Sequence, residues 1–483
     1  MNIKQIKALN IWESATLMTW MSYSTKAISL VGILPLVLKQ FTPEDVVLWY
    51  LFSTIIGIQS LADFGFRQTF SRIISFAFAG ATDIDIFNYK DSKSHENSSV
   101  CNTKLLSSII NVMMFLYRWL TVIVLILMIT LGSLSMVKPI SGVNLQTEAW
   151  ISWGVVIFAS CISFYSRVYL NFLEGLNKIA LVRRVETFTS LGAIFSSMVV
   201  LIWFPSLLNL VIVHQFWLIV SSLRDWYLCK IVNNNLFEKV YIKQPLDISI
   251  LRKIWAPAWR SGIGGLMSAG LTNLTSIIYA QFGNTASVAG YLLAIRLITQ
   301  IREVSMAPFY SKLPVLAMLR AKSDIVALKL TAKRGMKISH VVFLVGFILT
   351  SLCINPFLEI INSKVTFVSM HLWGLLGLAF FAHRFGAMHL QIYITTNHVI
   401  SHIADGVSGI LFILSAVFLS KYIGIYSIPV GMLTGYLLFY AWYTASHSYK
   451  SLGNESFWAF ERTTSLPMAI ILFVFFIISL MFY

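Results

Sequence analysis

The sequence predicts an all-α polytopic membrane protein, and three observations lead to this fold class. Hydrophobic residues make up 57% of the 483 residues and charged residues 12%, against about 45–50% and about 25% in soluble domains. The apolar residues are gathered in runs of about 20, the length of a membrane-spanning helix. Lysine and arginine are concentrated in alternate loops, as in membrane proteins whose cytoplasmic loops are positively charged. These observations exclude a soluble enzyme, a DNA-binding domain and a disordered chain.

Thirteen apolar runs are candidates to cross the bilayer. Residues 1–13 are expected to lie along the membrane surface as a short helix, because apolar residues recur at every third position, Ile3, Ile6, Leu9 and Trp12, against the polar Lys4, Lys7 and Asn10. The run from Ala15 to Leu38 is too long for the core of a cleaved signal peptide, so it is the first retained span. The spans are predicted over residues 14–38, 44–66, 105–134, 148–174, 185–204, 207–229, 254–281, 286–310, 335–355, 366–395, 400–420, 425–446 and 465–483.

The first twelve spans fall into two halves of six. Gln40-Phe41 is followed by Tyr50-Leu51, and Gln281-Phe282 by Tyr291-Leu292, at equivalent places in the two halves. Such internal repeats are typical of transporters, which bind their substrate between the halves. We expect an N-terminal six-helix bundle over residues 1–230, a basic cytoplasmic linker over 231–253, a C-terminal six-helix bundle over 254–446, and a cytoplasmic loop with an additional transmembrane helix over 447–483.

The loops predict a cytoplasmic N-terminus. With this orientation the cytoplasmic loops and the N-terminal segment hold 22 lysines and arginines and the outer loops hold four, Lys39, Lys138, Lys364 and Lys421. The net charge of +16 is therefore assigned to topology and to attraction by anionic membrane lipid, not to nucleic acid. No loop is long enough for a folded catalytic domain, and no nucleotide-binding or catalytic motif is present. The chain is predicted not to be an enzyme, with no catalytic residues.

Ten further lysines and arginines lie within or at the ends of the apolar runs. A charge at the middle of the bilayer costs roughly 2.5–3.5 kcal/mol, so such residues face a partner or a wet cavity. Three of them, Arg118, Arg167 and Arg224, lie near cytoplasmic span ends and are expected to extend toward the interface. The other seven are the candidate substrate-binding residues: Lys26, Arg67, Arg72, Arg260, Arg296, Arg302 and Arg384.

Five acidic residues lie near these cations. Arg224 with Asp225 and Arg302 with Glu303 are adjacent and are expected to neutralise one another. The remaining excess of positive charge predicts a cationic interior that suits an anionic ligand, such as a pyrophosphate or an acidic sugar. The candidates for coupling to H⁺ or Na⁺ are Asp63, Glu174 and Asp405.

Metal binding and other cofactors are not predicted. The four cysteines are widely spaced and form no CxxC or His/Cys cluster. His398, His402 and Asp405 share one helix face. A polar face at the level of the lipid headgroups is the first interpretation of these three residues, with a protonatable coupling site or a metal site as alternatives.

Residues 61–81, LADFGFRQTFSRIISFAFAGA, interrupt an apolar run with Asp63, Arg67 and Arg72. One straight helix over residues 44–80 would be about 55 Å long, longer than the bilayer, so we expect a break at Gly65. Asp-Phe-Gly-Phe, then an arginine, then Ser-Phe-Ala-Phe-Ala-Gly resembles the bacterial O-antigen flippases of the Wzx type. These belong to the polysaccharide-transport branch of the superfamily that also contains the MATE drug exporters.

This resemblance implies a fold of two six-helix bundles in a V around a central cavity. It implies an undecaprenyl-pyrophosphate-linked oligosaccharide as substrate, flipped across the bacterial inner membrane by alternating access. It also implies an O-antigen polymerase and a chain-length regulator as partners. Of the candidate residues, Arg67 and Arg72 lie in the resembling segment, so the resemblance itself assigns only these two to the pyrophosphate and acidic sugars.

Two other functions remain alternatives. An O-antigen polymerase or ligase would also be polytopic, but such an enzyme is expected to carry a large periplasmic loop, and the outer loops here are short. A MATE-like exporter of small organic ions would share the fold. The cationic interior argues against cationic cargo for such an exporter but not against organic anions.

Overall fold

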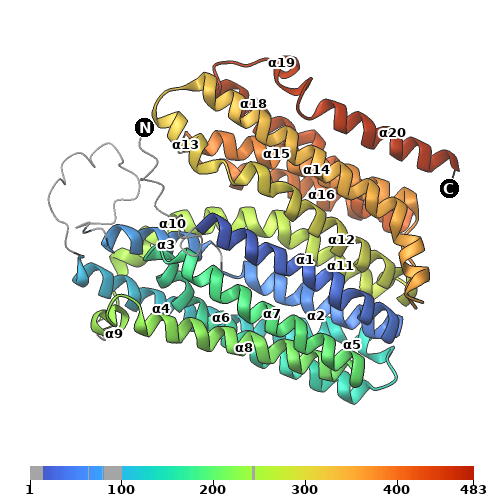
Figure 1. Cartoon of the computed structure of the whole chain (residues 1–483), viewed down its shortest axis with the longest axis horizontal. Coiled ribbons are helices and arrows are strands. Elements are labelled where there is room, and N and C mark those ends of the chain that lie inside the picture. The colour runs from blue at the N-terminus through green and yellow to red at the C-terminus, as the bar shows by residue number, and fades with distance from the viewer. Residues whose placement is uncertain are drawn as a thin grey trace, which may run out of the picture. The chain divides into compact units, whose positions relative to one another are not determined.

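A computed structural model describes residues 15–63, 65–78, 80, 101–241, 245–396 and 398–482, and within these ranges the chain is helical and contains no strand. The chain divides into two compact units, Met1–Gly262 and Ile263–Tyr483. The boundary lies inside helix α10 (Ile248–Gly265), in the range predicted for the first span of the second bundle. Figure 1 shows the helices of each unit running side by side as a bundle.

The first unit begins with α1 (Ala15–Gln40), α2 (Pro43–Leu61) and α3 (Phe66–Phe78). A long helix follows, in which α4 (Thr103–Leu127) continues through a π-helical turn η4 (Met128–Gly132) into α5 (Ser133–Ser141). The unit is completed by α6 (Gln146–Gly175), α7 (Ile179–Trp203), α8 (Leu207–Ile231), the short α9 (Leu236–Val240) and the beginning of α10.

The second unit continues α10 through a π-helical turn η5 (Leu266–Gly270) into α11 (Leu271–Phe282). Four helices follow: α12 (Thr285–Tyr310), α13 (Leu313–Ala321), α14 (Ile325–Ile360) and α15 (Met370–Ile394). The remaining elements are α16 (Ser401–Ile423), the 3₁₀ turn η6 (Gly424–Tyr426), α17 (Ser427–Gly435), the π-helical turn η7 (Tyr436–Tyr440), α18 (Ala441–Ser451), α19 (Phe457–Glu461) and α20 (Leu466–Phe482).

Every apolar run predicted from the sequence contains a helix of the structure, which confirms the all-α class. By length and composition, six helices of the described chain are candidates to cross a membrane: Thr103–Ser141, Gln146–Gly175, Ile179–Trp203, Leu207–Ile231, Ile325–Ile360 and Ser401–Ser451. Large apolar side chains such as Ile126, Leu131 and Leu352 are more than half exposed on these helices, as expected for surfaces that face lipid.

The beginning of one span differs from the sequence expectation by ten residues, for a local reason. The predicted span 335–355 begins ten residues earlier, at Ile325, because the carboxylate of Asp324 accepts a hydrogen bond from the backbone N–H of Ala327 over 3.0 Å and so caps the helix. The predicted span 44–66 ends earlier, at Leu61. The basic segment 311–334 is therefore largely helical, formed by α13 and the first turns of α14.

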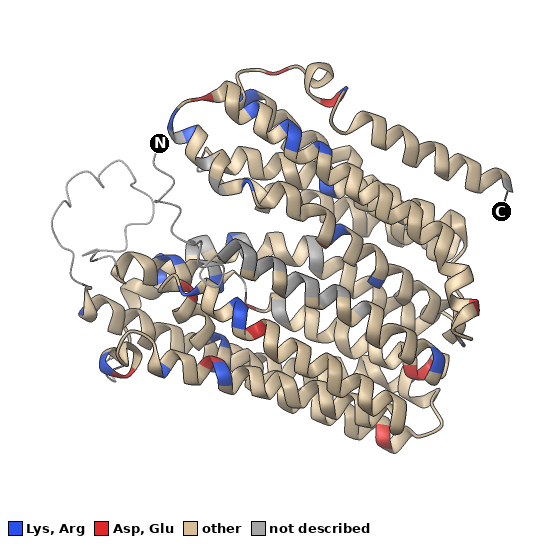
Figure 2. Cartoon of the chain, in the orientation of Figure 1, with Lys and Arg blue, Asp and Glu red and all other residues tan. Residues whose placement is uncertain are grey.

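The charged residues are distributed unevenly along each bundle. Figure 2 shows long helical stretches without charge. In the first unit, lysine and arginine gather toward the end where α3 and α9 lie, and in the second unit toward the end where α13 lies and α14 begins. This distribution follows the asymmetry that the loops predicted.

Close packing in the second unit depends on a glycine at one helix contact. α16 packs along α17 and η7. A Cβ atom on Gly435 would lie 2.3 Å from the backbone oxygen of Ser408, a distance that no side chain tolerates. Glycine at this position therefore lets the two backbones approach, as small residues do in membrane helix pairs.

Candidate functional site

The break between α2 and α3 places a carboxylate in the interior of the first unit. Gly65 has a φ of +72°, in the left-handed region that glycine adopts without strain, so the predicted break at this residue is confirmed. Asp63 is 6% exposed, and its Oδ1 accepts a hydrogen bond from the backbone N–H of Arg67 over 3.2 Å. The carboxylate therefore satisfies a backbone donor in the first turn of α3.

Two polar side chains from other helices complete the surroundings of Asp63. The hydroxyl of Tyr117, on α4 and fully buried, donates to Oδ1 of Asp63 over 2.6 Å. The same hydroxyl accepts a hydrogen bond from Nδ2 of Asn171, on α6, over 2.8 Å. The Oδ1 atom of Asn171 is buried and has no hydrogen-bond partner within the described chain. Sequence reasoning missed Tyr117 and Asn171. Each is a polar side chain within an apolar run, and this pattern could have indicated a buried polar contact.

Arg67 forms an ion pair with Glu174 that joins α3 to α6. Its Nε donates to Oε2 over 3.1 Å and its Nη2 to Oε1 over 2.5 Å, which is the two-bond geometry that arginine makes with carboxylates. The side chains are 39% and 14% exposed. A second contact between these helices runs from the hydroxyl of Ser75 to the backbone oxygen of Gly175 over 2.7 Å. The structure therefore brings three sequence candidates together: Asp63, Arg67 and Glu174.

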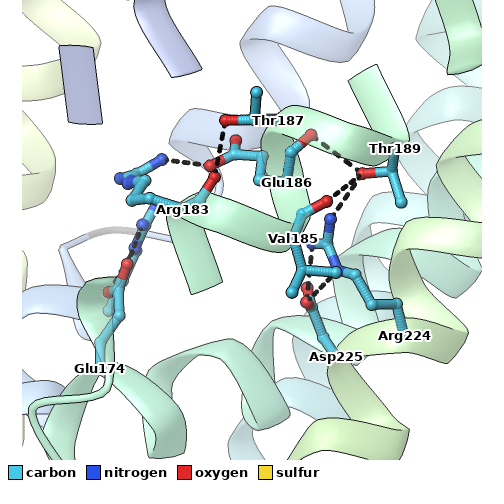
Figure 3. Close-up of polar contacts among 9 residues, drawn as sticks. Glu174, Arg183, Val185, Glu186, Thr187, Thr189, Arg224 and Asp225 are labelled. Carbon is cyan, nitrogen blue, oxygen red and sulfur yellow. Dashed lines mark hydrogen bonds and ion pairs between the residues drawn. The ribbon is translucent and has the colours of Figure 1, made fainter. Parts of the chain in front are cut away.

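The adjacent residues Arg224 and Asp225 form the ion pair that the sequence predicted, with Nη2 2.7 Å from Oδ1. Figure 3 shows Arg224 extending from α8 toward Thr189 on α7, to whose hydroxyl its Nη1 donates over 2.7 Å. On α7, Arg183 pairs with Glu186 over 2.7 Å. Arg67, Arg183 and Arg224 are thus each neutralised by a carboxylate.

Two other candidates of the first unit are exposed. Arg72 is exposed on α3, and Arg260 is exposed on α10 with its Cζ 5.8 Å from the ring centre of Trp259. Lys26 lies in α1, and its side chain is outside the part of the chain that the structure describes. Of the seven candidate cations, only Arg67 is shown in an ion pair by the described residues.

Arg384, on α15, is fully buried inside the second unit. Its Nη2 donates to the backbone oxygen of Ser339 over 2.7 Å and lies 3.4 Å from that of Ser305. Its Cζ lies 4.5 Å from the ring centre of Phe343, close enough for a cation–π interaction. Within the described chain, Nε and Nη1 have no hydrogen-bond partner. Arg384 thus links α15 to α12 and α14 while part of its donor capacity stays unused.

A group of aromatic and charged side chains lies beside Arg384 in the second unit. His383 stacks on Tyr440, with ring centres 5.3 Å apart, and contacts Tyr436 at 4.9 Å. Arg302, on α12 and partly exposed, lies 5.6 Å from the ring centre of Phe380. Phe380 and His383 lie three residues apart on α15, and residues at this spacing share one helix face. The structure therefore brings Arg302 and Arg384 into one cluster around His383.

Asp405 enters the same region from α16. It is 7% exposed, and a Cβ on Gly264 would lie 3.2 Å from its Oδ2. α16 packs against both π-helical turns, η5 and η7, and such turns are frequent at functional sites. The described residues contain no group of three or more His, Cys, Asp or Glu side chains able to hold a metal ion.

Three arginines of the second unit differ from the paired arginines of the first unit. In the first unit, Arg67, Arg183 and Arg224 each pair with a carboxylate. In the second, Arg296 is exposed on α12, and the ion pairs found among the described residues do not include Arg296, Arg302 or Arg384. Guanidinium groups without a carboxylate partner are able to bind phosphate through paired N–H donors.

Comparison with known proteins gives no match to a protein-family model and no match to a curated protein sequence. Solved structures do match over nearly the whole chain. One is the inward-facing conformation of a multidrug resistance MATE family transporter of the MOP superfamily, with a TM-score of 0.63 and 13% identity, covering 94% of this chain and 96% of that chain.

Two further structures show the same likeness. The outward-facing conformation of a multidrug resistance MATE family transporter of the MOP superfamily has a TM-score of 0.57 and 14% identity, covering 92% of this chain and 98% of the other. A mutant of the Vibrio cholerae MATE transporter VcmN has a TM-score of 0.59 and 14% identity, with the same coverage, 92% and 98%. At this level of identity the likeness establishes the fold, and it confirms the predicted polytopic helical class.

Proposed function

We propose that this protein is a transporter that flips undecaprenyl-pyrophosphate-linked O-antigen repeat units from the cytoplasmic to the periplasmic leaflet of a bacterial inner membrane by alternating access. The observation that carries the proposal is the charge balance of the second unit. Arg302 and Arg384 lie in one cluster with His383, and neither forms an ion pair with a described carboxylate. An unneutralised pair of guanidinium groups suits a pyrophosphate, which presents several anionic oxygens.

The two arginines would have different roles in this site. Arg302 is partly exposed, so it is placed to contact the pyrophosphate or an acidic sugar directly. Arg384 is fully buried, so in this conformation it contributes its charge to the field of the site. Arg67 and Arg72, which lie in the segment resembling the O-antigen flippases, would bind the pyrophosphate or an acidic sugar in the first unit. Arg72 is exposed there, and Arg67 is paired with Glu174. Lys26, Arg260 and Arg296 complete the proposed set.

Asp405 is the best placed of the three candidates for H⁺ or Na⁺ coupling. Asp63 already accepts hydrogen bonds from Tyr117 and Arg67, and Glu174 is paired with Arg67. Asp405 is buried beside two π-helical turns, and the ion pairs found among the described residues do not include it. An ionisable group inside a transporter is commonly part of an ion pathway.

The proposed orientation places the N-terminus in the cytoplasm, because the ends of the bundles that are rich in lysine and arginine would then face the cytoplasm. The proposed partners are the lipid-linked oligosaccharide, membrane lipid, an O-antigen polymerase and a chain-length regulator. The chain would have no catalytic role of its own.

A MATE-like exporter of small organic anions is the second candidate function. The likeness to structures described as multidrug resistance MATE family transporters supports it. Such cargo would also be bound by the unneutralised arginines, but it would not require a path for a lipid tail.

The test is to delete the gene in its host and to separate the lipopolysaccharide on a gel. Loss of every repeat unit, restored by the wild-type gene, supports the flippase. A core that carries a single repeat would show that flipping works and that polymerisation failed, which identifies a polymerase. An unchanged ladder contradicts the proposal and directs the search to anion export. Restoration by Arg72→Gln together with failure of Arg302→Gln would assign the binding site to the second unit.

A further inference from the structure

The segment between α18 and α20 is tied to the beginning of α14. Lys329 and Lys333 both form ion pairs with Glu455, and the Nζ of Lys333 lies 3.3 Å from Oε1. The same Nζ donates to the backbone oxygen of Ala459 over 2.7 Å. The three charged side chains are 14–28% exposed, so water and salt reach this contact.

Six residues further along the chain, Glu461 is anchored in a different environment. Glu461 and His389, on α15, are both fully buried, and Nε2 of His389 lies 3.0 Å from Oε1. Oε1 also accepts from the hydroxyl of Tyr449, on α18, over 2.8 Å, and Oε2 accepts from the hydroxyls of Thr464 (2.7 Å) and Ser465. Each carboxylate oxygen therefore has two donors, which is what a buried carboxylate requires.

The helix that follows is packed on the same unit. α20 lies mainly against α15. It also contacts α14, where the ring centre of Phe347 lies 5.2 Å from that of Phe475. A Cβ on Gly374 would lie 3.0 Å from the ring of Phe476, so α20 approaches α15 closely. Glu461 thus holds the chain at the point where it turns into α20.

We propose that residues 452–465 form a strap with a fixed end at Glu461 and a releasable end at Glu455. The fixed end joins α15, α18 and the start of α20. The releasable end joins the strap to α14, so its opening frees the beginning of α14 while α20 stays docked. The physical basis is that water reaches the ion pairs of Glu455, whereas Glu461 is fully buried. Salt therefore screens the charges at Glu455 and leaves the hydrogen-bonded carboxylate of Glu461 almost unaffected.

Hydrogen–deuterium exchange of the full-length protein in lipid nanodiscs tests this. The backbone N–H of Glu455 is bonded to the oxygen of Tyr449 over 3.1 Å, and that of Arg462 to Trp458 over 3.2 Å, so both ends have amides that report opening. Lys333 holds the segment as far as Ala459, so we expect 1 M salt to speed exchange over 455–459 by about fivefold, the upper end of what an ion pair reached by water supplies, and to leave the amides of 461–465 unchanged.

Substitutions at the lysines of α14 and at Glu461 test the two ends of the strap separately. Lys329→Gln with Lys333→Gln should reproduce the effect of salt at low ionic strength, whereas Lys337→Gln, an exposed position one turn further along α14, should not. Glu461→Gln should speed exchange over 457–465 as well.

Equal responses of the two ends to salt would overturn the proposal. So would exchange of the whole strap at the rate of an unfolded peptide, or a lysine double variant that behaves like Lys337→Gln. The salt series uses the unmodified protein, so it decides the question even if Glu461→Gln does not fold.

Discussion

The guanidinium of Arg67 binds the carboxylate of Glu174 through two hydrogen bonds, of 3.1 and 2.5 Å, across 107 positions of the sequence. This ion pair holds α3, which follows the break at Gly65, against α6. The arginine that the resemblance to O-antigen flippases singles out is therefore already partnered in this conformation, so a substrate anion at Arg67 would compete with Glu174.

The Arg67–Glu174 pair predicts a measurable coupling. Arg67→Gln and Glu174→Gln should each lower the thermal stability of the purified protein, and the double variant should be less destabilised than the sum of the two. We expect a coupling of about 1 kcal/mol, because the pair is bidentate but partly exposed. A double-mutant cycle of unfolding midpoints measures it, and Arg72→Gln, exposed on the same helix, is the control. Strict additivity would contradict the ion pair.

Tyr117 predicts a stability effect at the centre of the first unit. Tyr117→Phe removes the donor to Asp63 and the acceptor for Asn171, leaving two buried polar groups short of a partner, which costs about 1–3 kcal/mol. The unfolding midpoint should fall clearly. Tyr165→Phe, on α6, is the control and should have little effect. The hydrogen bond found for the hydroxyl of Tyr165 is a weak one, to the sulfur of Met114 over 3.8 Å. Equal midpoints for the two variants would refute the role of Tyr117.

Arg384 predicts opposite changes in stability and transport. Arg384→Met replaces a buried cation by an apolar side chain of similar length, an exchange that is often neutral or stabilising. We expect the unfolding midpoint to be maintained or raised while complementation of the deletion strain is lost. Arg384→Ala should be destabilised by about 2–4 kcal/mol because it leaves a cavity. Full complementation by Arg384→Met would remove Arg384 from the proposed site.

The strap predicts a dependence of stability on pH. The pKa of Glu455 lies below its ordinary value of 4.5, chiefly through the hydrogen bond from Lys329. Burial alone would raise the pKa of Glu461, but the hydrogen bond from His389, with those from Ser465 and Thr464, lowers it overall. A carboxyl whose pKa is lowered by folding stabilises the folded state above its unfolded pKa, and this stabilisation is lost as pH falls through the folded pKa.

The unfolding midpoint should therefore lose the contribution of the strap below about pH 4.5, the ordinary pKa from which these carboxyls are lowered. Glu455→Gln should reduce the slope of stability against pH in that range, and Lys337→Gln should leave it unchanged. An identical slope for wild type and Glu455→Gln would contradict the ion pairs with Lys329 and Lys333. Thermal unfolding followed by intrinsic fluorescence between pH 3.5 and 7 gives the comparison.

The sequence alone was sufficient to locate the helices. Each apolar run contains a helix because a segment in lipid must satisfy its backbone hydrogen bonds internally, and a helix does so whatever its neighbours are. The break at Gly65 was also predictable from the sequence, because one straight helix over residues 44–80 would be longer than the bilayer and a glycine accommodates a break without strain. The adjacent pair Arg224–Asp225 was also predictable. The pair Arg302–Glu303, predicted in the same way, is not among the ion pairs found in the described residues, because adjacent side chains on a helix point in different directions.

Only the tertiary structure decided how the distant charges are partnered. The sequence could not show that Arg67 meets Glu174, that Asp63 is held by Tyr117, or that His389 meets Glu461, because each contact depends on the rotation and packing of separate helices. It equally could not distinguish the buried Arg384 from the exposed Arg296, since both are arginines within apolar runs. Local composition determines that a helix forms, whereas the contacts of its side chains are determined by the helices that pack around it.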